Sequence, residues 1–264
     1  MKRNCERGKV NKKVVIIGLG EIGGVFARGF LRSGVTVCPV NRSMDIRQAA
    51  NDEPDPDLVV LAVAEKDLHE SISAIPRIWR SKLVLLQNEL LPSDWQKHEL
   101  FSPTVISVWF EKKKGRDVKV LIPSPVYGQG AELIKTALES IEIPVRIVAN
   151  EQALEDELVL KNVYILTTNI AGLVCGGNVE FMWNENHVLT REIANEIMDI
   201  QSWLIGKTLD RKKLFAGFEE AIEGDLAHQC MGRSANARLA RAISIANEAK
   251  LDVAKIREIA ADLS

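Results

Sequence analysis

Three glycines near the start of the chain have the spacing of a turn that binds phosphate groups. They follow a short apolar run at 14–17 and open an apolar stretch with helical spacing. Gly18 permits the tight turn, Gly20 lets a pyrophosphate approach the backbone, and Gly23 lets the helix pack close to the strand. The phosphates then lie at the helix N-terminus, where free N–H groups favour negative charge. The residues predicted to contact a dinucleotide here are Gly18, Leu19, Gly20, Glu21, Ile22 and Gly23.

The end of the second apolar run favours NADP(H) as the dinucleotide. Residues 35–40 read as a strand, and Asn41, Arg42 and Ser43 follow it. In a dinucleotide-binding fold this place faces the adenosine ribose, and an acidic side chain there would bind the 2′-hydroxyl of NAD. The chain instead offers neutral and positive donors, which suit a 2′-phosphate. The alternative is that Arg42 is only a solvated turn residue.

A lysine inside an apolar helix suggests the reaction. Reduction of a carbonyl by hydride develops an alkoxide, so the site needs a donor that stabilises this charge and hands over a proton. Lys161 stands before the almost wholly apolar residues 163–174, and on helical spacing it shares a face with Thr168 and Asn169. This pattern predicts that Lys161 is a general acid. The alternative is an ordinary solvated surface lysine.

Alternating strands and helices must position these residues. The sequence predicts a mostly parallel, doubly wound sheet of the Rossmann type over residues 1–149, with its last strands forming a hairpin around the basic turn at 112–116. Residues 58–64 form a continuous apolar run, as in strands buried on both faces. The other predicted strands are 82–87, 105–110, 118–122 and 145–148, with helices after 64 and at 131–140.

From residue 150 the pattern becomes helical throughout. Asn150 is a good N-cap for a helix over 151–175, and Asp252 for one over 252–263. The other predicted helices are 187–206, 211–231 and 234–250. We therefore expect an all-α domain over 150–264 that contributes to the substrate cleft and, through its long apolar helices, is compatible with a homodimer.

Composition narrows the class of protein. The chain of 264 residues is 46% apolar and 27% charged with a net charge of −2, as in a soluble globular protein, so neither a nucleic acid nor a membrane is expected as a partner. The apolar runs are short of the ~20 residues of a membrane span. The basic residues 2–13 read as a solvated arm without the apolar region of a secretory signal. Four cysteines without metal-binding spacing suggest reduced thiols, no metal and a cytoplasmic location: Cys5, Cys38, Cys175 and Cys230.

Three segments carry a family resemblance. They are the glycine turn, Leu86-Gln87-Asn88 at a strand end, and Leu158-Val159-Leu160-Lys161 followed eight residues later by Asn169. With them the chain resembles the ketopantoate reductases, which belong to the 6-phosphogluconate-dehydrogenase-like group of two-domain NADP enzymes. The resemblance implies Lys161 as general acid, Asn88 at the nicotinamide and substrate end, and Asn169 as a substrate contact. For Asn169 a buried amide satisfied by backbone stays equally open. The expected cofactor site also includes Ala62 and Val63.

Several positions depart from the family pattern. Glu89 stands where a glycine usually follows the asparagine, Ile165 where a second asparagine is usual, and Ala64 where a lysine is usual, with Lys66 two residues on. Near the C-terminus, alignment on Met231 puts Cys230 in place of a serine, and alignment on Asp225 puts Arg233 in place of an acid. These departures imply a substrate other than ketopantoate.

The sequence leaves three hypotheses. The first is an NADPH-dependent reductase of a 2-oxo acid or related carbonyl compound. The second is a non-catalytic NADP-binding protein, and the third an imine or pyrroline-type reductase, for which the expected substrate loop is absent from the sequence. Among Arg233, Arg238 and Arg241 one could bind a substrate carboxylate, or all three could lie on a solvated helix face.

Overall fold

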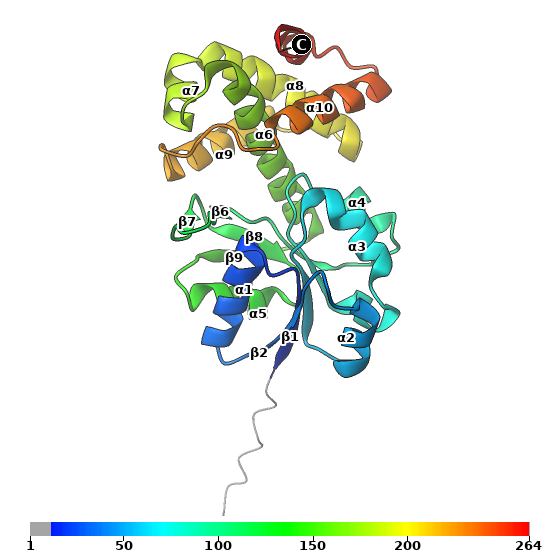
Figure 1. The fold of residues 1–264 in the computed structure, drawn as a ribbon. Helices are drawn as coiled ribbons and strands as arrows, with labels where there is room; N and C mark the ends of the chain where they lie inside the picture. Colours follow the sequence, from blue (N-terminus) through cyan, green and yellow to red (C-terminus); the bar gives the residue numbers. More distant parts are fainter. Residues whose placement is uncertain (1–11, 264) are drawn as a thin grey trace, which may run out of the picture.

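The structure is a computed structural model that describes residues 12–263. Most of the predicted arm at residues 2–13, and Cys5 with it, lie outside the described residues. Figure 1 shows a sheet flanked by helices in the first half of the chain and a cluster of helices in the second half. The expected combination of a Rossmann-type α/β domain and an all-α C-terminal region is therefore confirmed.

The main sheet is parallel except at one pair. Its order is β2-β1-β3-β4-β5-β8-β9, and among the described strands of this sheet only the β5–β8 pair is antiparallel. The register puts Ile17 beside Val40 on one side and beside Leu61 on the other, so three strand ends meet at one edge. The strands are β1 Lys13–Ile17, β2 Thr36–Val40, β3 Leu58–Leu61, β4 Leu83–Leu85, β5 Thr104–Ile106, β8 Ser124–Tyr127 and β9 Val145–Ile147.

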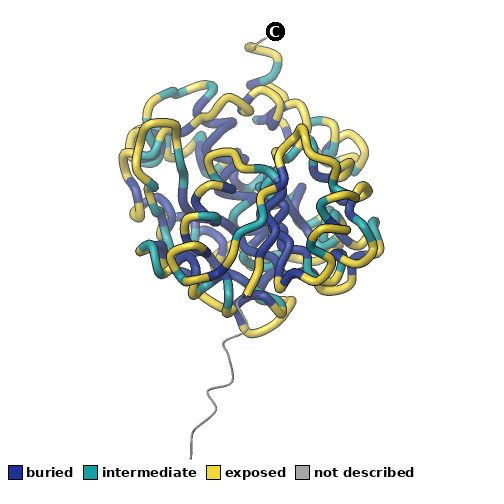
Figure 2. Tube along the Cα trace, turned by 60° about the horizontal axis from the view of Figure 1, so that its bottom comes forward, coloured by how far each residue is buried: buried dark blue, intermediate teal, exposed yellow. Residues whose placement is uncertain are grey.

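Both faces of this sheet are covered, because successive strand residues point to opposite sides. Val14 and Ile16 pack with α1 and α5 on one face, and Val15 and Ile17 belong to the core on the other face. The flanking elements are α1 Glu21–Arg32, α2 Ile46–Asp52, η1 Glu65–Asp67, α3 Leu68–Ala74, η2 Arg77–Lys82, α4 Pro92–Gln96 and α5 Ala131–Glu139. Figure 2 shows the buried trace running through the strands.

Two predicted strand assignments need correction. The strand expected at 105–110 is interrupted, since β5 ends at Ile106 and β6 (Phe110–Glu111) pairs with β7 (Lys119–Val120) in a separate two-stranded sheet. This pair forms the predicted hairpin around 112–116. The sequence interpretation missed β8, whose Pro125 is a residue that argues against a strand inside a sheet.

The helical half is built around α6 (Glu151–Cys175). The Asn150 side chain caps it by accepting a hydrogen bond from the Ala153 N–H at 2.9 Å, as expected. The other helices are α7 Val179–Glu185, α8 His187–Ile205, α9 Arg211–Gly224, α10 Ala235–Ala249 and α11 Ala254–Asp262. The predicted helix 211–231 ends early, and the expected cap at Asp252 was wrong, because Val253 occupies the N-cap of α11.

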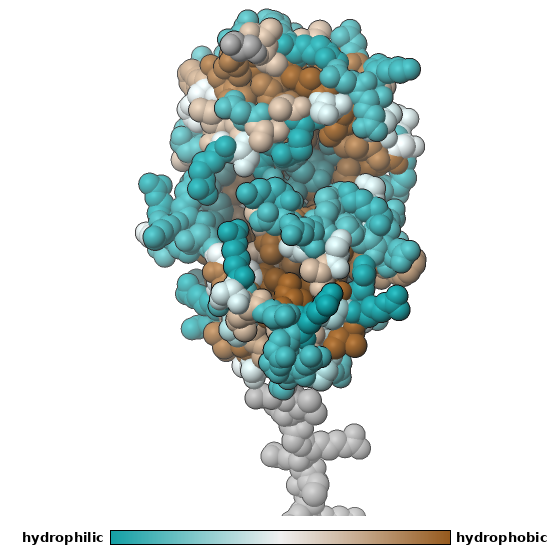
Figure 3. All heavy atoms as spheres, turned by 45° about the vertical axis from the view of Figure 1, so that its right-hand side comes forward, coloured by the Kyte–Doolittle hydropathy of each residue, from teal (hydrophilic) through white to brown (hydrophobic). Residues whose placement is uncertain are grey.

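Helix α6 is a core helix. By length and composition it could cross a membrane, against the expectation that apolar runs are too short, but 72% of its apolar window is buried inside the structure. It packs against α8, α9 and α10. On the face drawn in Figure 3, hydrophilic residues cover most of the surface with smaller hydrophobic areas between them, as is ordinary for a soluble protein.

Candidate active site

The glycine turn between β1 and α1 has the close approaches expected of a dinucleotide-binding loop. Gly18 adopts a φ of +89°, and a Cβ on it would lie 2.6 Å from the Ala62 carbonyl oxygen. A Cβ on Gly23 would lie 2.0 Å from the Gly18 oxygen, so the helix touches the turn. Nothing lies within 4 Å of a Cβ on Gly20, which is the N-cap of α1 without a side-chain cap. The turn therefore leaves space for a phosphate where the helix offers its free N–H groups.

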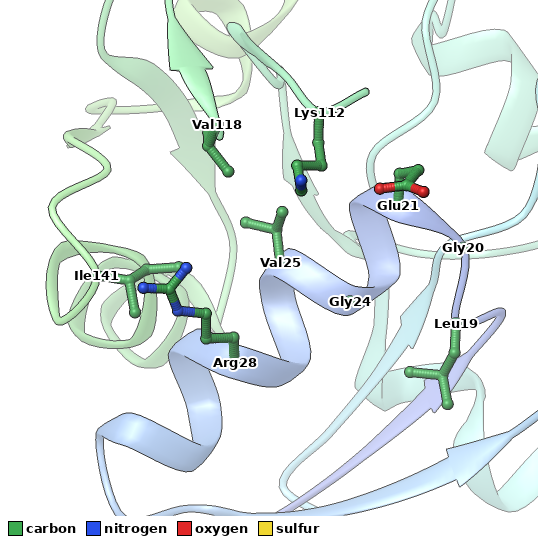
Figure 4. A pocket seen from close by; sticks show the side chains of 9 residues that line it. All are labelled: Leu19, Gly20, Glu21, Gly24, Val25, Arg28, Lys112, Val118 and Ile141. Carbon is green, nitrogen blue, oxygen red and sulfur yellow. The ribbon is translucent and has the colours of Figure 1, made fainter. Parts of the chain in front are cut away.

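The β6–β7 hairpin leans over this helix. Figure 4 shows Lys112 reaching from the hairpin toward the start of α1, with Val25 below its amine and Glu21 beside it. The hollow that these residues line is open to solvent, has a volume of about 340 Å³ and continues along α1 to Arg28. The rings of Phe26 and Phe110 pack 6.3 Å apart between centroids and hold the hairpin against the helix.

The tip of β2 is open to solvent. Asn41 Oδ1 accepts hydrogen bonds from the Ser43 N–H at 3.0 Å and from Ser43 Oγ at 2.7 Å, which fixes the turn. The Arg42 side chain is 95% exposed, and its Nη2 lies 3.7 Å from Asp67 Oδ2. An arginine held this loosely is able to turn toward a ligand.

A larger cavity of about 630 Å³ lies between the two halves of the chain. Gly20 and Ile22 reach it from the glycine turn, and Lys161 reaches it from α6. The other predicted site residues that line it are Glu21, Ala62, Val63, Asn88 and Asn169. The structure does not place Asn41, Arg42 and Ser43 on this wall, nor Gly18, Leu19 and Gly23. Lys66, considered as a substitute for the family's lysine, is exposed and lies outside the lining.

Lys161 is half-buried in this cavity. Its Nζ lies 4.2 Å from the centroid of the Trp109 ring, in a cation–π contact. Burial, and then the charge of Arg238, lower the pKa of Lys161 from 10.5 to about 7, against the opposing effect of Glu65. A lysine that titrates near neutrality is able both to donate a proton and to recover it. It is not the solvated surface lysine of the alternative interpretation.

Asn88 follows β4 and reaches toward the other strand end. Its Nδ2 donates to Glu65 Oε1 at 2.8 Å. The neighbouring Gln87 is buried and donates from Nε2 to the Leu61 carbonyl oxygen at 2.6 Å. These hydrogen bonds join the ends of β3 and β4 and so stabilise the cavity wall formed by Ala62 and Val63.

An arginine from α10 closes the wall between the two halves. Arg238 is 7% exposed and donates from Nη2 to Glu65 Oε1 and from Nε to Glu89 Oε1, both at 2.8 Å. Arg241 binds Glu89 from the more exposed side. Glu89 holds a φ of +58°, in the left-handed region that glycine favours, at the position where the resemblance expects glycine. The interpretation of these arginines as a solvated helix face is therefore wrong for Arg238.

Asn169 has its hydrogen-bonding groups already engaged. Its Nδ2 donates to the Ile165 carbonyl oxygen at 2.9 Å, and its Oδ1 accepts from Arg238 Nη1 at 3.1 Å and from the Gly232 N–H at 3.2 Å. The side chain lines the cavity and contacts Arg238, and its amide is satisfied by backbone groups as in the second interpretation. The substrate contact stays a prediction.

The sequence interpretation missed the hydroxyl group of Tyr164, which follows Lys161 by three residues in α6. Tyr164 is 2% exposed and lines the cavity with an OH that has no hydrogen-bond partner among the described residues. The ring of His228, from the loop after α9, lies 6.3 Å away between centroids. Its Nδ1 is 3.9 Å from Asp225 Oδ2 and from Glu111 Oε2. Burial lowers the pKa of His228 and raises that of Tyr164. Their sequence positions carry no motif, since the loop brings them together only in the fold.

The C-terminal alignments have a partial counterpart in space. Cys230, Met231 and Arg233 line the cavity, whereas Asp225 lies behind it and pairs with Lys119. Cys38, Cys175 and Cys230 are free thiols. Within residues 12–263, no group of three or more acidic, histidine or cysteine side chains could hold a metal ion.

Solved structures share this architecture. A ketopantoate reductase from Staphylococcus aureus superposes with a TM-score of 0.67 at 17% identity, over 95% of this chain and 97% of that one. A PanE/ApbA family ketopantoate reductase from Ralstonia eutropha JMP134 gives 0.66 at 14% identity, over 94% and 96%. A D-mandelate dehydrogenase with NADH and anilino(oxo)acetate gives 0.65 at 13% identity, over 94% and 96%. The chain therefore has the ketopantoate reductase fold, as the resemblance predicted.

Sequence comparison adds a short match. Epoxyqueuosine reductases from Bacillus cereus and Bacillus anthracis are each 33% identical over 79 residues, which is 28% of this chain. The chain spans about a fifth, 21%, of the length of these curated relatives. No family model matches the chain.

Proposed function

We propose that the protein is an NADPH-dependent oxidoreductase that reduces a 2-oxo acid or a related carbonyl compound. The observation that carries this proposal is the cavity that Lys161 shares with the glycine turn. The fold supports it, since the D-mandelate dehydrogenase of the same fold is solved with NADH. The space at Gly20 fits the pyrophosphate of a dinucleotide, and Arg42 favours the 2′-phosphate of NADP(H). We also propose that residues 1–149 form the cofactor-binding domain and residues 150–264 the helical domain on the substrate side.

Each residue has a role in this scheme. When bound, NADPH supplies the hydride. Lys161 stabilises the charge on the carbonyl oxygen and donates the proton, Asn88 borders the nicotinamide end, and Asn169 holds the wall on the substrate side. Ala62, Val63 and the turn from Gly18 to Gly23 support the cofactor. We also propose that the protein is cytoplasmic. We further propose that it is a homodimer, which a light-scattering measurement of its mass in solution would test.

The test is replacement of Lys161 by methionine. We expect NADPH affinity within about threefold of the wild type, and turnover lowered by about 10²–10⁴-fold, because proton donation and charge stabilisation are lost together. Isothermal titration with NADPH and an NADPH-oxidation assay over a panel of carbonyl compounds measure the two quantities. Lys66→Met replaces an exposed lysine of η1 that does not line the cavity; it is the matched control and should keep both. Normal turnover in Lys161→Met would refute the assignment.

The second candidate is a non-catalytic NADP-binding protein of the same fold. The replaced substrate positions favour it, above all Glu89, whose carboxylate binds Arg238. It predicts that NADPH raises the melting temperature while no carbonyl compound in the panel drives NADPH oxidation.

Arg42 provides the test of cofactor choice. Arg42→Ala should weaken NADPH binding by about tenfold and leave NADH binding unchanged, because only NADPH carries the 2′-phosphate. Arg47→Ala, an exposed arginine in α2, is the control. An equal loss for both cofactors would show that Arg42 does not read the phosphate.

A further inference from the structure

The arginine best placed to bind a substrate carboxylate already binds two carboxylates of the protein. Arg238 is the buried cation on the cavity wall beside Asn169, and its guanidinium has five N–H groups in one plane. Nε donates to Glu89, Nη2 to Glu65 and Nη1 to Asn169. The fork geometry that an incoming carboxylate would need is therefore taken up by these three side chains.

The charges of this cluster cancel. Arg238 and Arg241 contribute two positive charges, and Glu65 and Glu89 contribute two negative charges within ion-pair distance of them. Glu65 itself lines the cavity, so an anion placed beside Arg238 meets a carboxylate at short range. Like charges at such separations repel strongly in a partly buried site.

The other cations of the cavity do not replace Arg238. Lys161 carries only part of a charge near pH 7, where it titrates. Lys113 pairs with Glu111 at 3.1 Å, and Lys112 reaches toward α1 beside the glycine turn. Arg233 lines the cavity and is exposed, which makes it a competing anchor that the experiment has to examine.

We propose that the substrate of this site is a carbonyl compound without a carboxylate next to its carbonyl group, because Glu65 and Glu89 occupy Arg238. A 2-oxo ester, a 2-oxo amide or a simple ketone fits this class, and a free 2-oxo acid does not. The inference rests on the proposed NADPH-dependent reduction and narrows its substrate.

The test measures oxamate binding to the NADPH-loaded protein by isothermal titration. Oxamate is a pyruvate analogue with an amino group in place of the methyl group. We expect the wild type to bind it weakly. Glu65→Gln keeps the shape and the hydrogen bond to Arg238 while removing one negative charge, so its oxamate affinity should rise by about tenfold or more. Glu70→Gln removes an exposed charge of α3 outside the cavity lining and should leave the affinity unchanged.

Each outcome decides the matter. Tight oxamate binding by the wild type, lost in Arg233→Ala, would overturn the proposal, as would equal gains in Glu65→Gln and Glu70→Gln or no gain in Glu65→Gln. Faster reduction of pyruvate than of methyl pyruvate by the wild type would also overturn it. Failure of the wild type to bind NADPH at all would instead refute the proposed function, and this inference with it.

Discussion

At the scale of the residue, Lys161 determines how the activity should depend on pH. Its pKa is lowered to about 7, and only the protonated amine donates a proton. We expect kcat/KM for carbonyl reduction to be level below this pH and to fall by about tenfold per pH unit above it. Measurement with NADPH between pH 5 and 9 checks the profile. A level profile up to pH 9 would mean that another group supplies the proton.

The same pKa shift has a consequence for stability. A lysine whose pKa is lower in the folded than in the unfolded state releases its proton on folding between pH 7 and its ordinary value of 10.5. The unfolded state then binds more protons, so Lys161 makes the free energy of unfolding rise with pH over this window. Lys161→Met should show a smaller rise from pH 7 to 9 in urea unfolding. An unchanged slope would mean that the folded amine keeps its ordinary pKa.

Individual residues were predictable where their chemistry is local. Gly20 and Lys161 stand out in the sequence by a spacing and by an apolar surrounding, and the fold brings both to one cavity. Glu65 and Arg238 are separated by 173 positions and make their contact only in the folded chain. No local pattern marks such a pair, which is why the sequence interpretation considered Arg238 without its partners.

At the scale of the element, different glycines of the strand–turn–helix unit serve packing and cofactor binding. A Cβ at Gly23 would clash with the Gly18 oxygen, whereas one at Gly20 meets open space. We expect Gly23→Ala to lose about 1–3 kcal/mol of stability, and Gly20→Ala to melt normally but bind NADPH about tenfold more weakly. Thermal unfolding and titration measure both.

Gly24 is the control for this pair. It also faces open space and lies one residue inside the helix from Gly23. Gly24→Ala should gain up to about 1 kcal/mol from helix propensity and keep its NADPH affinity. Weaker binding in Gly24→Ala by the same factor as in Gly20→Ala would show that the effect is not specific to the phosphate position.

Elements with a clear period were predictable from the sequence, and short ones were not. Helix α6 begins and ends where the apolar pattern and Asn150 indicate. The proline-containing β8 depends on pairing with β5 and β9, and β6 leaves the line of β5 to pair with β7 in a separate sheet. Helix α9 ends at Gly224, where a Cβ would lie 2.1 Å from the Leu121 oxygen, so the β7 region and not the local pattern sets this end.

At the scale of the whole molecule, Arg238 joins the two halves of the chain. Its removal leaves Glu65 and Glu89 without their buried partner, so Arg238→Met should cost about 3 kcal/mol of unfolding free energy. Arg241→Met removes a pair whose arginine side chain is 47% exposed and should cost at most about 1 kcal/mol. Urea unfolding of both variants measures the difference. Equal losses would contradict the importance of the buried contact.

The burial of α6 has a consequence for how the protein is made. The helices that cover it, α8, α9 and α10, all follow it in the sequence, and α10 ends only at Ala249. At ribosomal elongation rates of roughly 5–20 residues per second, its apolar surface stays uncovered on the nascent chain for several seconds. During that interval a segment long and apolar enough to enter a bilayer is exposed to water. Synthesis of this chain should therefore depend on chaperones that shield apolar segments until the last helices emerge.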